Sequence, residues 1–212
     1  MKWLERWHGA RVHTRRVQVL ASTAANFLPQ HATVLDIGCG DGRLSALLAN
    51  LRPDLSVSGA EVAPRSDCAI PVTGFDGRKL PFADDSFDAT LLVDVLHHTT
   101  EPAVLLSEAV RVARHVVVLK DHFRDGLGAF ATLRFMDVVG NRRHGVPLPF
   151  NYLNRREWNA LFDRCGVVAE SSDSLAGLYP FPANLVFGRG LHFFARLAIR
   201  RQPPLALKAD PA

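Results

Sequence analysis

Short apolar runs alternate with amphipathic stretches along most of the chain. The runs are rich in β-branched residues and are bounded by Gly, Pro or Asp, which favours buried strands at 32–37, 55–60, 70–74, 87–95 and 115–120. Apolar positions with helical spacing precede or separate them at 2–27, 42–51 and 102–113. The alternation predicts an α/β fold, a doubly wound and mostly parallel sheet with helices on both faces.

The last third of the chain is less regular. Residues 123–150 are rich in Gly, Arg and aromatic side chains and include one amphipathic stretch, 129–139; a helix at 155–165 and strands at 167–171 and 191–199 follow. A long insertion in a compact domain is often a lid or a binding loop. We therefore expect a single domain over 1–202, with its substrate or lid insertion at 123–150 and a flexible tail at 203–212.

Composition and charge narrow the class of protein. The 212 residues are 48% hydrophobic and 22% charged, with a net charge of +4, as in an ordinary globular domain. The basic residues are dispersed as isolated pairs, which argues against nucleic acid as a partner. The three cysteines lack the spacing of a disulfide framework or a metal site. The sequence also has no apolar run long enough for a signal peptide or a transmembrane helix. We therefore expect a cytoplasmic protein without stable membrane insertion. A homodimer stays open.

A glycine-rich turn joins the first predicted strand to the following helix. Asp36, Gly38, Gly40 and Gly42 form the pattern D-x-G-x-G-x-G, in which the glycines permit positive φ and close approach of a ligand to the backbone. The dinucleotide fingerprint has one more residue before its third glycine, and Asp36 would repel a pyrophosphate. Glu61 ends the next strand, where a carboxylate can accept hydrogen bonds from both hydroxyls of a ribose. The loop therefore favours a nucleoside ligand with a cationic amine and no phosphate.

Three motifs in this order resemble the class I S-adenosylmethionine-dependent methyltransferases, in particular the bacterial group that acts on small molecules. They are VLDIGCGDG, GAEVAP and FDGRKLPFADDSFDATLLVDVLHH, within residues 34–120, and NYLNRREWNALFDRCGV at 151–167 is a weaker match. The resemblance implies a Rossmann-like, seven-stranded sheet with the last strand antiparallel. It also implies S-adenosyl-L-methionine as the cofactor and a small molecule as the substrate.

The resemblance assigns cofactor contacts by position. The methionine end would lie against Asp36 and the loop backbone, above the end of the fourth strand; the ribose would bind Glu61, where many relatives have Asp. Val62 would pack beside the adenine, and Asp76, here followed by Gly-Arg, would accept from its amino group. The full set is Asp36, Gly38, Cys39, Gly40, Glu61, Val62, Asp76, Gly77, Val93 and Asp94.

Candidate acid–base residues follow the fourth and fifth strands. His98 is the second residue of a His-His pair, where the relatives often have histidine, and could accept a proton from a hydroxyl or phenol. Asp121 and His122 end the fifth strand, although adjacent strand residues usually point apart. We name His98, Asp121 and His122 as catalytic candidates. We expect no metal site, because the histidines belong to different loops.

The sequence thus predicts an enzyme that methylates an oxygen, nitrogen or carbon atom of a small, partly apolar molecule. Three alternatives stay open: a catalytically inactive, cofactor-binding regulatory subunit, a nicotinamide-dependent oxidoreductase, and a methyltransferase that works at a membrane surface on a lipid-like or quinone-like substrate. The last would use the aromatic residues Trp3, Trp7, Phe181, Phe187, Phe193 and Phe194.

Overall fold

A single seven-stranded sheet forms the centre of the molecule. The computed structural model describes residues 2–141, 148–175, 177–181, 183–188 and 190–200. The strands, in the order β3-β2-β1-β4-β5-β7-β6 across the sheet, are β1 (Thr33–Ile37), β2 (Ser56–Glu61), β3 (Val72–Gly74), β4 (Phe87–Val93), β5 (Ala113–His122), β6 (Val167–Ser174) and β7 (His192–Ile199). Only the two pairings made by β7 are antiparallel within this sheet. The expected Rossmann-like sheet with an antiparallel last strand is confirmed.

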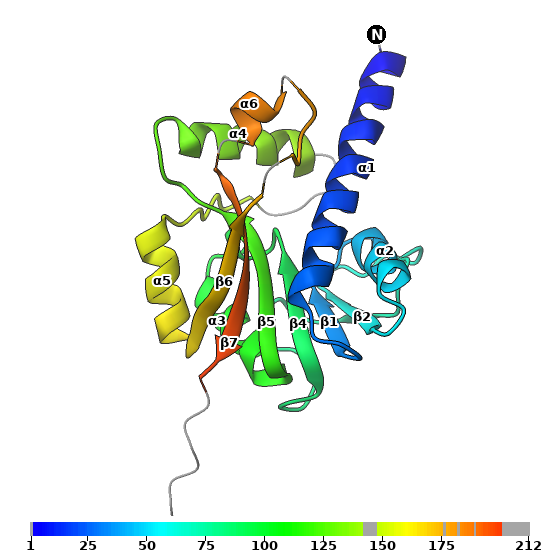
Figure 1. Ribbon diagram of the computed structural model, residues 1–212, viewed down its shortest axis with the longest axis vertical. Helices are drawn as coiled ribbons and strands as arrows, with labels where there is room; N and C mark the ends of the chain where they lie inside the picture. The colour runs from blue at the N-terminus through cyan, green and yellow to red at the C-terminus, as the bar shows by residue number, and fades with distance from the viewer. Residues whose placement is uncertain (1, 142–147, 176, 182, 189, 201–212) are drawn as a thin grey trace, which may run out of the picture.

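Two helices cover each face of the sheet (Figure 1). On one face α1 (Lys2–Phe27) and α2 (Arg43–Leu51) pack in a core that includes Val34, and on the other α3 (Pro102–Val112) and α5 (Arg155–Arg164) pack in a core that includes Leu35. Successive strand residues point to opposite faces, so a strand covered on both sides needs an unbroken apolar run. The predicted helices and strands thus correspond to those observed.

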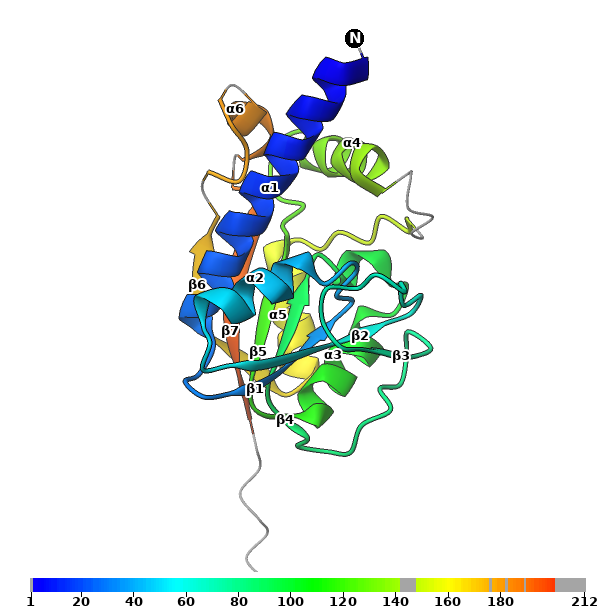
Figure 2. The same cartoon turned by 90° about the vertical axis from the view of Figure 1, so that its right-hand side faces the viewer.

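Two further helices lie beyond the edge of the sheet at which the parallel strands end (Figures 1 and 2). They are α4 (Ala129–Asn141), which contains the helix expected at 129–139, and α6 (Ala183–Phe187). Ala129 and Leu133 of α4 pack against Tyr152 and Leu191. Several other large apolar residues of this region are exposed. We call these the apolar lid residues: Leu127, Phe130, Phe135, Val139, Phe181, Leu185 and Val186.

Several strand ends differ from the prediction: β3 begins at Val72 rather than at residue 70, β6 extends to Ser174 rather than 171, and the ends of β4 and β5 also differ. β4 ends at Val93 rather than at residue 95, because Asp94 has a φ of 59° and turns the chain out of the sheet. β5 is longer than predicted and includes Asp121 and His122, because β7 pairs with it up to that point. The corrections to β4 and β5 matter because both strand ends carry residues of the candidate site.

The aromatic residues considered for a membrane surface have different environments. Phe193 and Phe194 are buried in the two cores, whereas Phe181 is exposed. The side chains of Trp3 and Trp7, like the predicted tail 203–212, lie outside the described residues. Among the helices of the described residues, none combines the length and the apolar composition needed to cross a membrane.

Candidate functional site

The glycine loop between β1 and α2 leaves open space above its backbone. Gly38 and Gly40 have φ values of 74° and 60°, which L-residues with a side chain rarely adopt. A Cβ added at Gly38 would lie 2.7 Å from Cγ2 of Val95, whereas one added at Gly40 would meet no protein atom within 4 Å. The loop can therefore receive a ligand that lies directly against the backbone at Gly40.

Glu61 fixes this loop to the end of β2. Its Oε2 accepts a hydrogen bond from the Gly40 N–H, at 2.8 Å, and its Oε1 accepts one from the Val62 N–H, also at 2.8 Å. A carboxylate has about four acceptor positions, so roughly two are left for other donors. The side chain thus has the capacity that the ribose assignment requires.

The residues assigned to the adenine lie beside Glu61. Val62 is 58% exposed, and its Cγ2 lies 3.4 Å from where a Cβ of Gly77 would be. Oδ1 of Asp76 accepts hydrogen bonds from the N–H groups of Arg78 and Lys79, at 2.8 and 2.7 Å. These backbone bonds, that of Lys79 first, lower the pKa of Asp76 and hold its side chain in a local turn. The ends of β2 and β3 thus bring this group together.

Asp36 is buried at the end of β1, where its carboxylate accepts a hydrogen bond from the Ser45 hydroxyl of α2, at 2.6 Å. Burial raises the pKa of Asp36 to about 7, and the nearby charge of Glu61 acts in the same direction. A cation bound close to Asp36 would stabilise its ionised form. Ser45 was not predicted from the sequence, although its place in the first turn of the helix after the glycine loop could have indicated it.

Asp94 joins three elements by ion pairs. Its carboxylate contacts the guanidinium of Arg16 from α1 and the ammonium of Lys120 from β5, and the Lys120 side chain is fully buried. Burial by itself would raise the pKa of Asp94, but Lys120 and Arg16 outweigh it and hold that pKa well below its ordinary value. Neither basic residue was identified from the sequence.

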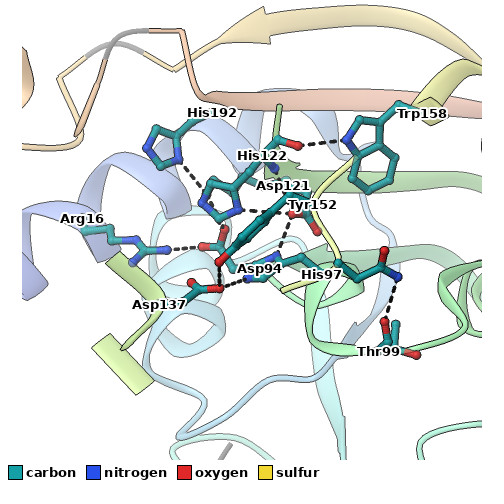
Figure 3. Close-up of polar contacts among 12 residues, drawn as sticks. Arg16, Asp94, His97, Thr99, Asp121, His122, Asp137, Tyr152, Trp158 and His192 are labelled. Carbon is teal, nitrogen blue, oxygen red and sulfur yellow. Dashed lines mark hydrogen bonds and ion pairs between the residues drawn. The ribbon is translucent and has the colours of Figure 1, made fainter. Parts of the chain in front are cut away.

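A second group of polar side chains surrounds His97 (Figure 3). Nδ1 of this buried histidine lies 2.7 Å from Oδ1 of Asp121, and its Nε2 lies 3.5 Å from Oδ2 of Asp137 in α4. Asp137 also accepts a hydrogen bond from the Tyr152 hydroxyl. Burial opposes a charge on His97, but Asp121 and Asp137 outweigh it and raise its pKa to about 10. The sequence favoured the adjacent His98 as the candidate, and Asp137 and Tyr152 were not predicted from it.

The three catalytic candidates are close together but differ in accessibility. His98 is half-buried in the one-turn helix η1 (Leu96–His98), with its ring centre 4.1 Å from that of His97. Asp121 and His122 are buried. The expectation that they point apart is wrong, because Oδ1 of Asp121 accepts from the His122 backbone N–H at 2.8 Å and lies 3.2 Å from its Nδ1. The catalytic assignment of the three residues stays a prediction.

His122 is held within the cluster by its neighbours. Its Nε2 lies 3.4 Å from the Lys120 ammonium, and its backbone oxygen accepts a hydrogen bond from the Trp158 indole at 2.9 Å. Burial and the Lys120 charge lower the pKa of His122 to about 4. His122 is therefore uncharged at neutral pH and lies next to a fixed cation.

Comparison with known proteins finds methyltransferase relatives. Residues 35–118 match the model of the Methyltransferase domain family. The bifunctional methionine biosynthesis protein MetXA/MetW of Rhodopirellula baltica is 29% identical over 166 residues, which are 71% of this chain and 25% of that protein. The demethylmenaquinone methyltransferase of Renibacterium salmoninarum is 29% identical over 153 residues, 66% of this chain and 64% of that protein. The chain thus spans less than two thirds of each of these relatives.

A solved S-adenosylmethionine-dependent methyltransferase of Thermotoga maritima has the same fold, with a TM-score of 0.64 over 94% of this chain and 96% of that chain, at 20% identity. The domain match, the curated relatives and the strand order agree with the resemblance seen in the sequence. Residues 35–118 thus match a methyltransferase domain, and the chain has the Rossmann-like fold of the class I methyltransferases.

Replacing Gly40 by Ala tests the open space above the loop, and Gly166 provides a matched control. Gly166 has a φ of 69°, also has open space at its Cβ position, and lies between α5 and β6. We expect Gly40→Ala and Gly166→Ala to destabilise the fold by a similar amount, roughly 1–2 kcal/mol for a left-handed residue. Only Gly40→Ala should weaken binding of S-adenosylhomocysteine in calorimetry. Equal affinities would show that no ligand approaches Gly40.

Asp36→Asn tests the buried carboxyl. The folded pKa of about 7 lies above the ordinary value of 3.8, so ionisation of Asp36 opposes folding, and wild-type stability should fall as the pH rises between these values. We expect Asp36→Asn to be more stable than the wild type at pH 8, by at most roughly 4 kcal/mol, and equally stable near pH 4. Urea unfolding measures this, with exposed Asp67→Asn as the control. A constant difference across this range would contradict the assignment.

Proposed function

We propose that the protein transfers a methyl group from S-adenosylmethionine to an oxygen, nitrogen or carbon atom of a small, partly apolar molecule. The observation that carries the proposal is the open glycine loop held by Glu61, with a polar cluster directly beyond the end of β4. When bound, the cofactor supplies a methyl group on a positively charged sulfonium. Methyl transfer then depends mainly on alignment of the two reactants and exclusion of water.

In this proposal each strand end would bind a different part of the cofactor. The methionine end lies against Asp36 and the backbone from Gly38 through Cys39 to Gly40, and the ribose hydroxyls donate to Glu61. The adenine lies beside Val62, Asp76 and Gly77, and Val93 and Asp94 form the floor. Asp94 is already paired with Arg16 and Lys120, so it fixes the chain below the cofactor instead of neutralising the sulfonium.

The part of the site that would receive the methyl acceptor combines the buried polar cluster around His97 with the exposed apolar lid residues. We assign half-buried His98 as the general base. It would accept a proton from the methyl acceptor when the acceptor's nucleophilic atom carries one. Asp121 and His122 are buried and contact His97, so we assign them to positioning the His97–His98 pair. The presence of histidine and tyrosine side chains next to the transfer position disfavours the alternative of an inactive cofactor-binding subunit.

The apolar lid residues support an acceptor with an apolar part. The Phe130 ring packs edge-on against Tyr152, with 5.8 Å between the ring centres, and so links the exposed surface to the polar cluster. Phe135 stacks on Phe187 and joins α4 to α6. The relative named demethylmenaquinone methyltransferase carries a lipophilic acceptor in its name, which is consistent with this class.

Removal of the Glu61 carboxylate tests the cofactor site. We expect Glu61→Ala to weaken binding of S-adenosylmethionine by about 1–3 kcal/mol, because hydrogen bonds to a charged partner are lost. Titration calorimetry measures this, and Glu170→Ala, which removes a carboxylate paired with Arg196 far along the sheet, is the matched control. An unchanged dissociation constant for Glu61→Ala would rule out the ribose assignment, and no binding by the wild type would rule out the proposed function.

The acceptor class can be tested with a methyl-labelled cofactor. We expect transfer to phenols or hydroquinones with an apolar tail, and poorer transfer to the same head groups without one. Phe130→Ser should raise the KM for the tailed acceptor about 3- to 10-fold, since part of the energy of burying an aromatic side chain is lost. Val168→Ser, at an exposed apolar position on β6, is the control. Equal transfer rates to acceptors with and without the apolar tail would contradict the proposal that the acceptor has an apolar part.

A further inference from the structure

The polar cluster places metal-ligating side chains from two distant segments next to one another. His97 and His98 belong to η1, and Asp137 belongs to α4; one ligand atom from each lies within 4.8 Å of the others. We propose that these three residues form a binding site for a divalent transition-metal ion such as Zn²⁺. Two imidazoles and one carboxylate are a ligand set that such ions prefer in sites that keep a coordination position open.

His97 has the arrangement of a metal ligand. Its Nδ1 is held by Asp121 at 2.7 Å, whereas its buried Nε2 has no hydrogen-bond partner and lies 3.5 Å from Oδ2 of Asp137. A metal-ligating histidine typically has its other ring nitrogen bonded to a carboxylate, which fixes the orientation of the ring. A buried polar atom without a partner is costly, and coordination of an ion would satisfy it.

The charges of the cluster favour a bound cation. Among the described residues around His97 there are three carboxylates, those of Asp94, Asp121 and Asp137, but only two basic side chains, Arg16 and Lys120. The third carboxylate is therefore balanced either by a proton on His97 or by a metal ion that takes the place of that proton. Burial of an uncompensated charge is strongly unfavourable.

The same charges decide on which side of His97 the ion binds. Asp94, His97 and His122 also have ligand atoms within 4.8 Å of one another. However, the Lys120 ammonium contacts Asp94 and lies 3.4 Å from Nε2 of His122, so a metal ion there would be repelled. Asp137 instead has the neutral Tyr152 hydroxyl as its neighbour. The site therefore lies on the α4 side.

Coordination requires only a small adjustment. In a tetrahedral site, bonds of about 2.0–2.2 Å place ligand atoms roughly 3.3–3.6 Å apart, so atoms now within 4.8 Å of one another must close by at most roughly 1.5 Å. Because Asp137 lies on α4, the ion would tie this helix to the chain that follows β4. In the metal-bound form His98 is a ligand and no longer accepts the proton of the acceptor. Three protein ligands leave a position for an acceptor hydroxyl, whose deprotonation to solvent the ion would favour. That last role rests on the proposed function, whereas binding of the ion does not.

Cobalt is a suitable probe because its visible d–d bands report coordination geometry. Tag-free protein, stripped with a chelator, is titrated with Co²⁺ and then with Zn²⁺ in competition at pH 8. We expect one ion per chain, with bands typical of four or five ligands. Asp137→Asn, which can still accept from Tyr152, and His98→Gln should each weaken binding at least about 10-fold. The control His115→Gln removes an exposed histidine at the opposite end of β5 and should bind as the wild type.

Binding of S-adenosylhomocysteine and the far-ultraviolet circular dichroism are measured on the same samples to show that each variant is folded. If the wild type binds S-adenosylhomocysteine but no Co²⁺, the metal site is refuted and the proposed function stands. If Co²⁺ binds but S-adenosylhomocysteine does not, the proposed function fails and the metal site stands. If Co²⁺ binds equally to Asp137→Asn, His98→Gln and the wild type, the ion lies elsewhere and the assignment is refuted.

Discussion

The ion pairs of Asp94 are the interaction on which the rest of the site depends. A largely buried carboxylate is destabilising unless it is paired, and Arg16 and Lys120 pair with Asp94, whose side chain is 15% exposed. Arg16 draws α1 to the end of β4, and Lys120 links β4 to β5. Removing either base would leave a buried charge with too little compensation, so the position of α1, the turn after β4 and the end of β5 are stabilised together.

The two halves of the site obey different physical constraints. The cofactor half is formed mainly by the backbone of three glycines with positive φ. The Glu61 carboxylate accepts a hydrogen bond from the Gly40 N–H and fixes this backbone, so that a ligand can approach it closely. The acceptor half is built from side chains that four segments contribute, and its polar atoms must satisfy one another because water is largely excluded. This difference explains why one short sequence motif indicates the cofactor half, whereas no single motif indicates the acceptor half.

Most of the fold and the cofactor half could be predicted from the sequence. Val34 and Leu35 point to opposite faces of the sheet, so an apolar run without alternation indicates a strand covered on both sides, and its end in glycines locates the turn. Glu61 follows from its place at the next strand end. The errors were local: Asp94 adopts a positive φ that ends β4 early, and β7 extends β5 beyond the run of β-branched residues.

The sequence by itself determined the succession of strands and helices along the chain, the glycine loop and the class of ligand that suits it. Only the tertiary structure decided that Arg16 contacts Asp94, 78 residues away, and that Asp137 and Tyr152 approach His97 rather than solvent. The physical reason is that the periodicity of apolar residues reports which face of an element is buried but not which polar side chains meet there. Those pairings depend on how α1 and α4 pack against the end of the sheet, and burial then selects the pairs whose charges and hydrogen bonds compensate one another.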